Sequence, residues 1–233
     1  MADFNYHGPV VAFDLDDTLF RERDFCRSGF RFLCNLHRES LSPAETEALL
    51  QKMDAALADR ENPFSPYEDI FKNKGLEGFD IRNEIEIYRN HLPESLHFSE
   101  GVEEVLENFS SRGIRMALVT DGRSGTQRRK IEALGLDRFI APDLILISEE
   151  TGYDKHSRNN FAAVVRAFPE AKGFFYIGDN PEKDFYQPNL MGWTTVQAPS
   201  HPDNVHLPSM PTSAPYAPGH ILTDFTDLIK LIP

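Results

Sequence analysis

A short apolar run that ends in a group of acids constrains this chain more than any other feature. The run, residues 10–13, is followed at once by Asp14, Asp16 and Asp17. A continuous apolar run of this length is typical of a strand buried on both faces of a parallel sheet. Carboxylates beyond the carboxyl end of such a strand lie where open parallel sheets bind their ligands. From this segment alone, a binding site and an ordinary acidic turn both remain open.

The close spacing of these carboxylates also indicates a cation. Acids that lie within a few positions of one another repel when they ionise together. A divalent cation would relieve that repulsion, and Mg²⁺ prefers oxygen ligands that include one or two carboxylates. The segment therefore favours Mg²⁺ as a cofactor.

Beyond residue 95, the pattern alternates between strands and helices. Apolar strands are predicted at residues 115–119, 144–147, 173–177 and 194–196, with amphipathic helices between them. Such alternation is typical of parallel strands with helices on both faces of the sheet. The predicted fold is therefore α/β, with a Rossmann-like parallel sheet.

A helical segment interrupts this pattern between the first strand and the helix that precedes the second. Residues 21–95 contain no convincing strand. Ser42, Pro43 and Glu45 form a capping-box pattern that predicts the start of a helix. We therefore predict that residues 21–95 are an inserted, all-helical domain.

The core domain is accordingly predicted to comprise residues 1–20 and 96–233. The insertion leaves and re-enters the core close to the acids, so we expect it to lie above the site. Its junctions, residues 20–24 and 93–99, contain few apolar side chains. Such junctions can act as hinges.

Polar residues that suit phosphoryl chemistry follow the other predicted strands. Thr120 follows the second strand, and Lys155 lies eight residues beyond the third. Asp179 and Asp184 follow the fourth strand, so a parallel sheet gathers all of these residues on the same edge as Asp14. A carboxylate can attack phosphorus, and a second acid can protonate the leaving oxygen. A hydroxyl and a lysine can bind phosphoryl oxygens, and further carboxylates can hold Mg²⁺.

Taken together, these motifs resemble those of the haloacid dehalogenase (HAD) superfamily. The pattern is Asp-x-Asp-x-Thr at residues 14–18, then a threonine and a lysine beyond later strands, then Gly-Asp-x-x-x-x-Asp at residues 178–184. The resemblance covers nearly the whole chain except its proline-rich loop, and it points to the phosphatase-like branch. It implies that the helical insertion is the C1 cap of that branch.

The resemblance also implies a role for each motif residue. Asp14 would be the nucleophile and a Mg²⁺ ligand. Asp16 would be the general acid and base, with its backbone carbonyl on the metal. The other implied roles are phosphoryl binding by Thr120 and Lys155, metal binding by Asp179, and support of the site by Asp184, Asp121 and Asn180.

Two positions depart from the family's pattern. His156 follows Lys155 where the family commonly has proline. Gln187 and Pro188 stand where a Gly-Ala pair is common. The first departure concerns the loop that sets the position of the lysine, and the second concerns helix packing below Asp184.

The implied function is a Mg²⁺-dependent phosphate monoester hydrolase that acts on a small soluble phosphorylated metabolite through an aspartyl-phosphate intermediate. A dehalogenase or a phosphonate hydrolase is disfavoured, because those branches lack the second acid that Asp16 supplies. A phospho-acceptor receiver domain is disfavoured by the order of the motifs. A sugar-phosphate mutase of the same superfamily and a non-catalytic ligand-binding relative remain open.

Charge and composition indicate which partners and which location to expect for this protein. The formal net charge of -13 disfavours nucleic acid and anionic membrane surfaces as partners. No apolar stretch approaches the roughly 18 residues that a membrane span needs, and the N-terminus lacks the pattern of a signal peptide. We therefore expect a cytoplasmic protein, a monomer or weak homodimer, in which Cys26 and Cys34 are reduced.

Several residues near the motifs have no assigned role. Arg21, Arg23 and Arg123 lie near enough in sequence to meet an anionic substrate, although arginines are more often surface residues. His156 suits a polar loop better than a catalytic position. Residues 199–219 hold six of the sixteen prolines and predict a surface loop without regular structure.

Overall fold

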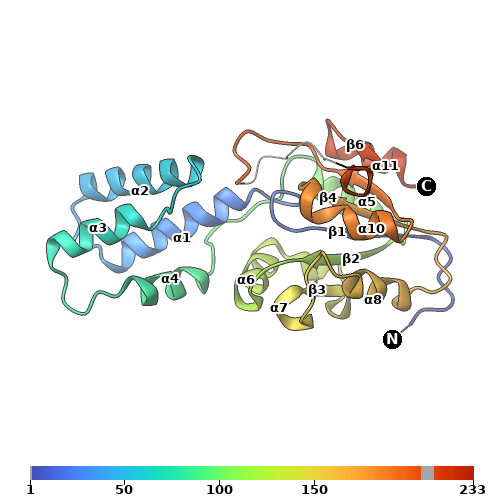
Figure 1. Ribbon diagram of the computed structural model, residues 1–233, viewed down its shortest axis with the longest axis horizontal. Helices are drawn as coiled ribbons and strands as arrows, with labels where there is room; N and C mark the ends of the chain where they lie inside the picture. Colours follow the sequence, from blue (N-terminus) through green and yellow to red (C-terminus); the bar gives the residue numbers. More distant parts are fainter. Residues whose placement is uncertain (1, 206–212) are drawn as a thin grey trace.

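A computed structural model of the chain describes residues 2–205 and 213–233. At its centre is a sheet of six parallel strands in the order β3-β2-β1-β4-β5-β6 (Figure 1). This order places β1, which leads into the acids, between β2 and β4. The predicted α/β fold with a parallel sheet is thus confirmed. The strands are β1 (Pro9–Phe13), β2 (Arg115–Thr120), β3 (Ile145–Ile147), β4 (Gly173–Gly178), β5 (Thr194–Gln197) and β6 (His220–Ile221).

Helices cover both faces of this sheet. The helices on one face are α5 (Val102–Ser111), α6 (Ser124–Leu134) and α11 (Leu228–Leu231). The other face is covered by α8 (Asn159–Ala167) and by the chain around α10 (Tyr186–Leu190). The short helices α7 (Ser148–Thr151) and α9 (Pro181–Asp184) follow β3 and β4 at the carboxyl edge.

Strand β1 is buried on both faces, as its unbroken apolar run predicts. Val11 and Phe13 pack in the apolar core on the α5 and α6 side. Val10 and Ala12 pack in the core on the α8 side. All four side chains are fully buried, so neither face of the strand leaves room for a polar residue.

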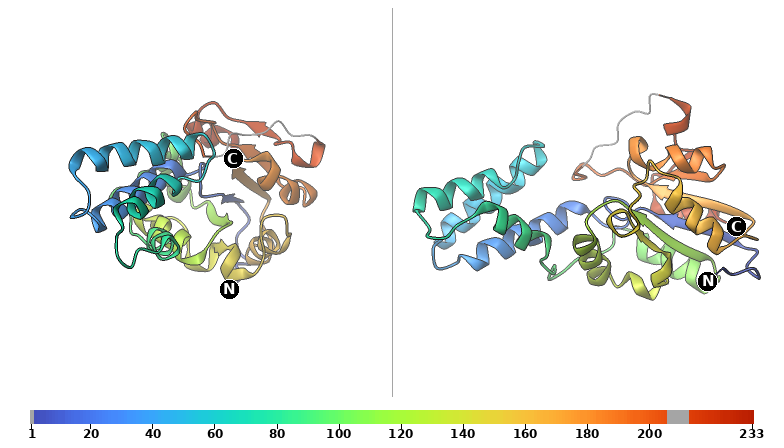
Figure 2. Two further views of the ribbon diagram at one scale, coloured as in Figure 1. Left: turned by 60° about the vertical axis from the view of Figure 1, so that its left-hand side comes forward. Right: turned by 60° about the horizontal axis from the view of Figure 1, so that its bottom comes forward.

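Four helices form a bundle beyond the carboxyl ends of the strands (Figure 1, Figure 2). They are α1 (Glu22–Leu36), α2 (Pro43–Ala58), α3 (Ser65–Lys74) and α4 (Ile81–Arg89). The bundle has its own apolar core, in which Tyr67 and Phe71 are fully buried. Ser42 and Glu45 make the predicted capping box at the start of α2. Within the described residues, no helix has the length and apolar character needed to cross a membrane.

The two junctions between the bundle and the sheet are better packed than predicted. Phe20 is fully buried and Leu96 nearly so, and both belong to the core on the α5 side of the sheet. The Ser99 amide donates to the Leu19 carbonyl at 2.9 Å, so the outgoing and returning chains are tied together. The few apolar residues present there thus reach the main core, and the role of these junctions as hinges stays a prediction.

Several element boundaries also differ from the predictions. Strands β2, β4 and β5 each end one residue later than predicted. Helix α5 begins after Gly101, which has a φ of +77°, a conformation that favours glycine. Pro142–Leu144 forms a 3-10 turn, so strand β3 begins one residue later than predicted. Helix and strand ends are decided by local backbone geometry, which apolar spacing does not encode.

Part of the proline-rich segment is ordered by hydrogen bonds. Ala214–Tyr216 forms a 3-10 helix. The Asn189 side chain donates to the carbonyls of Pro215 and Ala217 at 2.8 Å each. The prediction of a loop without regular structure is therefore wrong for these residues, and residues 206–212 of that loop lie outside the described residues.

The two cysteines both lie on α1. Cys26 and Cys34 are buried free thiols, in agreement with a helical separation too long for a disulfide. Burial raises the pKa of Cys26 to about 12 and that of Cys34 to about 11. At neutral pH both residues therefore act as small apolar packing groups.

Candidate active site

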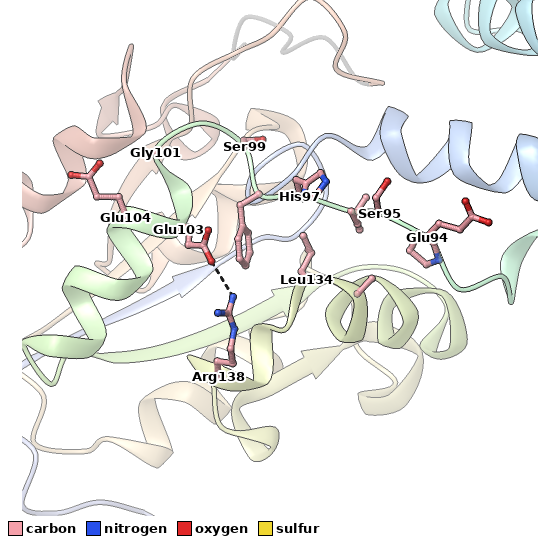
Figure 3. A pocket seen from close by; sticks show the side chains of 13 residues that line it. Glu94, Ser95, His97, Ser99, Gly101, Glu103, Glu104, Leu134 and Arg138 are labelled. Carbon is pink, nitrogen blue, oxygen red and sulfur yellow. Dashed lines mark hydrogen bonds and ion pairs between the residues drawn. The ribbon is translucent and has the colours of Figure 1, made fainter.

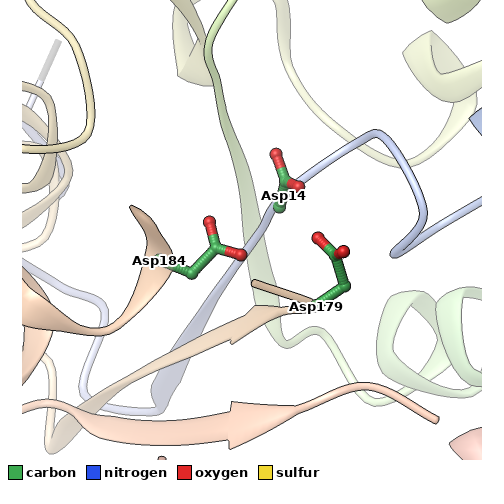
Figure 4. A group of neighbouring side chains, drawn as sticks. All are labelled: Asp14, Asp179 and Asp184. Carbon is green, nitrogen blue, oxygen red and sulfur yellow. The ribbon is translucent and has the colours of Figure 1, made fainter. Parts of the chain in front are cut away.

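Three carboxylates meet at the carboxyl edge of the sheet. Asp14 directly follows β1, Asp179 directly follows β4, and Asp184 ends α9. One oxygen of each lies within 4.8 Å of the others, and Figure 4 shows the three side chains facing a common space. Each of them is more than nine-tenths buried. The fold thus gathers the predicted acids into one dry cluster.

Lys155 supplies a positive charge to this cluster. Its ammonium contacts Asp14 Oδ1 and lies 2.7 Å from Asp184 Oδ1. Its backbone amide donates to Asp121 Oδ1 at 3.1 Å, so Asp121 anchors the loop that carries the lysine. Lys155 is only 4 % exposed, which distinguishes it from an ordinary surface lysine.

Gln187 and His156, which stand at the two positions that depart from the HAD pattern, contact each other. The side-chain amide of Gln187 donates to the backbone carbonyl of His156 at 2.6 Å. This hydrogen bond connects the loop after Lys155 to helix α10, at the point where the family commonly has proline. The His156 side chain is exposed and lies outside the lining of the carboxylate cavity.

Burial raises the pKa values of two of these acids, although Lys155 lies among them. Burial, together with the charges of Asp184 and Asp16, raises the pKa of Asp14 to about 8, although Lys155 acts in the opposite direction. Burial and Asp184 also raise the pKa of Asp179 well above its usual range. Burial opposes the charge of Lys155, but Asp14 and Asp184 raise its pKa well above its ordinary value. Burial thus disfavours the ionised forms of Asp14 and Asp179 even with a lysine beside them.

Asp184 is held in place by the backbone around it. Its Oδ2 accepts a hydrogen bond from the Asn180 amide at 2.8 Å, and its side chain is fully buried. A Cβ at position 178 would lie 2.5 Å from the same oxygen, so the close approach of this carboxylate requires Gly178. Tyr176 lies beneath the cluster and donates from its hydroxyl to the Val119 carbonyl at 3.1 Å.

Asp16 has a different set of partners, which come from helix α6. Lys130 Nζ donates to its Oδ1 at 2.6 Å, and Gln127 Nε2 donates to its Oδ2 at 2.9 Å. The same Nε2 also donates to Thr120 Oγ1 at 2.7 Å. Thr120 is almost fully buried behind the cavity lining. The two predicted residues Asp16 and Thr120 are therefore joined by a residue that the sequence reasoning overlooks.

Lys130 and Gln127 are missed because they lie in a polar and basic run, residues 127–130, that suggests an exposed helix face. Both are almost fully buried. Their spacing with Ile131 and Leu134 places all four on one stripe of α6, and that stripe faces the core. This helical spacing is the signal that could have identified them.

The cavity above the carboxylates is small, with a volume of about 130 Å³. Two further residues that the sequence reasoning overlooks, Glu22 and Lys183, line it. Burial, together with Asp16 and Asp17, raises the pKa of Glu22 to about 7, although Lys130 acts in the opposite direction. Asp17 adopts a φ of +54°, a strained conformation for a non-glycine residue and one that recurs at functional sites.

A larger cavity, of about 610 Å³, lies away from the carboxylates (Figure 3). It lies under the returning junction, residues 93–99, between the start of α5 and the end of α6. Arg138 and Glu103 form an ion pair of 3.1 Å within it. None of the predicted site residues lines this cavity. The reactive groups converge on the smaller one, which we therefore take as the active site.

The arginines near the motifs lie outside the carboxylate cavity. Arg23 is bound to Asp54 at 2.9 Å and to Asp203 at 3.1 Å. Arg123 forms an ion pair of 3.2 Å with a glutamate of α4. Arg21 lines a separate cavity of about 300 Å³. In this conformation, none of the three is placed against the space that the acids share.

Comparisons with known proteins identify the family of this chain. Residues 11–196 match the family model for haloacid dehalogenase-like hydrolases. A glyceraldehyde 3-phosphate phosphatase of Methanocaldococcus jannaschii is 24% identical over 191 residues, which cover 80% of this chain and 83% of that protein. A phosphoserine phosphatase of Thermus thermophilus is 26% identical over 227 residues, with coverage of 80% and 87%.

Among solved structures, the HAD-hydrolase YfnB of Bacillus subtilis, bound to magnesium, has a similar fold. It aligns with a TM-score of 0.60 and 20% identity, over 97% of this chain and 99% of that chain. The family model spans the bundle, all of the motifs and most of the sheet, which together make up most of the chain. The protein therefore belongs to the haloacid dehalogenase-like hydrolases and is an enzyme of that type.

Proposed function

We propose that this protein is a Mg²⁺-dependent phosphate monoester hydrolase that works through an aspartyl-phosphate intermediate on Asp14. The observation that carries the proposal is the convergence of Asp14, Asp179 and Asp184 around the ammonium of Lys155. Asp16, two positions beyond Asp14, lines the same cavity and supplies the second acid that phosphoryl transfer needs. The similarity to two phosphatases supports this reaction class.

The donor set fits a hard divalent cation. The three carboxylates present oxygens to a common space. Burial and neighbouring carboxylates raise the pKa values of Asp14 and Asp179, and a cation would favour their ionised forms. Among the residues that the structure describes, none donates a hydrogen bond to the Asp179 carboxylate, although it is only 7 % exposed. We propose that Asp14, Asp179 and the Asp16 backbone carbonyl hold Mg²⁺, with Asp184 in support. Bound there, the ion would neutralise charge on the phosphoryl group.

The reaction has two balanced halves. A carboxylate oxygen of Asp14 attacks phosphorus, the bond from phosphorus to the leaving oxygen breaks, and Asp16 gives that oxygen a proton. A water molecule then gives a proton to Asp16 and attacks the aspartyl phosphate at phosphorus, and the bond from phosphorus to the Asp14 oxygen breaks. Inorganic phosphate leaves, and Asp14 and Asp16 return to their starting states.

Thr120 and Lys155 are proposed to bind the transferring phosphoryl group. Thr120 Oγ1 already accepts a hydrogen bond from Gln127, so its own hydroxyl proton remains to be donated. Lys155 has three donors, of which two are directed at Asp14 and Asp184. Asp121 and Asn180 support these groups through the backbone contacts described above.

We propose that the substrate is a small phosphorylated metabolite. The cavity of about 130 Å³ leaves little space beyond a phosphoryl group. Residues 21–95 would then act as a cap domain on the core of residues 1–20 and 96–233, admitting substrate by moving. Closure of such a cap excludes water and strengthens charge interactions in the site. The partners and location that we propose are those predicted from the sequence: no nucleic acid or membrane partner, and a cytoplasmic monomer or weak homodimer.

The direct test is phosphate release from 4-nitrophenyl phosphate and from a panel of phosphorylated metabolites. We expect hydrolysis in the presence of Mg²⁺, loss of hydrolysis in excess chelator, and recovery when Mg²⁺ is restored. Acid quenching during turnover should leave a phosphoryl group on the peptide that contains Asp14. Absence of phosphate release from every ester in Mg²⁺ would contradict the proposal.

A further inference from the structure

We propose that Lys130 and Gln127 are positioning residues for Asp16, and that Lys130 connects this carboxylate to the first turn of the bundle. The inference rests on the proposed function, because it takes Asp16 as the group that transfers the proton to the leaving oxygen. It goes beyond that function by assigning a role to two residues that belong to none of the motifs.

Each oxygen of Asp16 has its own donor on helix α6. Lys130 Nζ lies 2.6 Å from Oδ1, and Gln127 Nε2 lies 2.9 Å from Oδ2. One contact leaves a carboxylate free to rotate about its last bond, whereas two contacts on different oxygens fix its plane. Asp16 keeps 20% of its side chain exposed, and it lines the carboxylate cavity. The pair of donors therefore sets the direction from which this acid meets a leaving oxygen.

The surroundings of Lys130 argue against a purely structural role. The side chain is 3 % exposed, and its ammonium lies 4.8 Å from the centre of the Phe25 ring and 5.8 Å from that of Phe20. A buried ammonium carries a desolvation cost, and an apolar side chain of similar volume often serves the fold as well or better. Its position on the apolar stripe of α6, with Ile131, would suit such a residue. The contact with Asp16 is what an apolar side chain could not provide.

Lys130 also reaches the bundle. Its ammonium lies 3.6 Å from Glu22 Oε1, and Glu22 is the first residue of α1. The Glu22 amide in turn donates to Asp17 Oδ1 at 3.0 Å, so this turn of α1 is held against the acidic loop. The lysine thus lies between an acid of the core and an acid of the bundle. A shift of α1 against α6 would change how Lys130 is shared between Asp16 and Glu22.

The test compares esters whose leaving alcohols need a proton to different degrees. 4-Nitrophenyl phosphate releases a stable phenolate, phenyl phosphate a less stable one, and benzyl phosphate an alkoxide that needs protonation. Lys130→Met keeps the length and removes the ammonium. We expect it to lower kcat on benzyl phosphate by about 10- to 100-fold, within the range of general acid catalysis, and on 4-nitrophenyl phosphate by less than about threefold. Asp16→Asn should show the same pattern with larger losses.

Two further variants separate positioning from general damage. Arg128→Met removes a charge from the same helix, where Arg128 is half exposed and bound to Glu150, and it should change no ester by more than about twofold. Gln127→Met should lower all rates, because it also releases Thr120, but it should lower the benzyl to 4-nitrophenyl rate ratio as Lys130→Met does. This ratio is independent of the fraction of folded enzyme, so partial unfolding would not imitate the effect.

The outcomes distinguish this inference from the function on which it rests. An active wild type with an unchanged rate ratio in both Lys130→Met and Gln127→Met would overturn the positioning role and leave the phosphatase intact. A wild type that hydrolyses none of the three esters would overturn the proposed function, and this inference with it. A changed ratio in Arg128→Met would show that any lost charge on α6 has the effect, and the specific role would be refuted.

Discussion

The carboxyl edge of the sheet and the core of the helical bundle both contain buried acidic side chains, but these side chains have different kinds of partners. At the edge, Asp14, Asp179 and Asp184 share a space with Lys155, and the pKa values of Asp14 and Asp179 rise. In the bundle, the buried acid Glu84 accepts a hydrogen bond from the Tyr67 hydroxyl at 2.9 Å and lies 3.1 Å from His37 Nε2. Glu84 thus finds its hydrogen-bond partners within the bundle itself.

This difference predicts what each region contributes to function, because a buried polar group with its partners in place behaves differently from one without them. A buried polar group with its partners in place contributes to a unique packing and has nothing left to bind. Buried acids with raised pKa values are destabilised until a cation and a substrate join them, and such sites are typical of catalysis. We therefore expect substitutions at the edge to affect chemistry, and substitutions in the bundle to affect stability and substrate choice.

The largest effect should come from Asp14→Asn. An amide does not attack phosphorus and is a poor Mg²⁺ ligand, so we expect kcat to fall by more than about 10³-fold while the fold survives. Steady-state hydrolysis of 4-nitrophenyl phosphate and a thermal melt measure the two quantities. Asp137→Asn, at an exposed acid of the core, is the matched control and should behave as wild type. Retention of more than a tenth of the wild-type rate would contradict the assignment of the nucleophile.

The next largest effect should come from Lys155→Ala. We expect kcat to fall by about 10²-fold, the scale expected when one preorganised donor to a transition state is removed. Its neighbour provides the control, because His156 is exposed and engaged through its backbone carbonyl. His156→Ala should therefore retain nearly full activity. The two variants are compared in one assay, with inorganic phosphate as a competitive inhibitor, and a greater loss in His156→Ala would reverse the assignment.

Asp179→Ala should raise the Mg²⁺ concentration needed for half-maximal rate by more than about tenfold, in line with the loss of a charged ligand. Asp184→Ala should raise it less, because Asp184 is already bound to Lys155 and to the Asn180 amide. Calorimetric titration of Mg²⁺ into each variant, without substrate, measures the requirement independently of turnover. Equal Mg²⁺ affinity in Asp179→Ala and wild type would remove Asp179 from the metal site.

Replacement of the bundle should alter substrate preference more than chemistry. A short Gly-Ser linker in place of residues 27–90 removes most of the bundle and leaves Phe25, which packs in the main core. Circular dichroism first establishes that the remaining core is folded. We then expect weak Mg²⁺-dependent hydrolysis of 4-nitrophenyl phosphate and loss of preference among metabolites. Both proteins are measured on one substrate panel, and an unchanged rank order would show that the bundle does not set specificity.

The smallest effect should come from Tyr67→Phe in the bundle. The variant leaves the buried Glu84 with one partner fewer, which costs on the order of 1–3 kcal/mol. Urea unfolding should detect this loss of stability, while kcat on 4-nitrophenyl phosphate should stay within about twofold of wild type. A fall in kcat as large as that of Lys155→Ala would show that the bundle takes part in the chemistry.

Sequence reasoning correctly predicted the features of this protein that depend on residues close together in the chain. The unbroken apolar run of β1, the Ser42 capping box and the alternation of strands with helices are all short-range patterns. Once the strands are parallel, topology alone brings the residues after β1 and β4 to one edge. That is why Asp14 and Asp179 could be placed together without a structure.

Tertiary structure decided the contacts between residues that are far apart in the chain. Asp16 meets Gln127 and Lys130 across 111 and 114 positions, and no local pattern encodes that pairing. The contact between Gln187 and the His156 carbonyl, and the burial of Phe20 at the junction, likewise depend on which surfaces pack together. Local sequence sets which face of a helix is apolar, whereas the partner of a polar residue on that face is fixed only when the elements dock and exclude water.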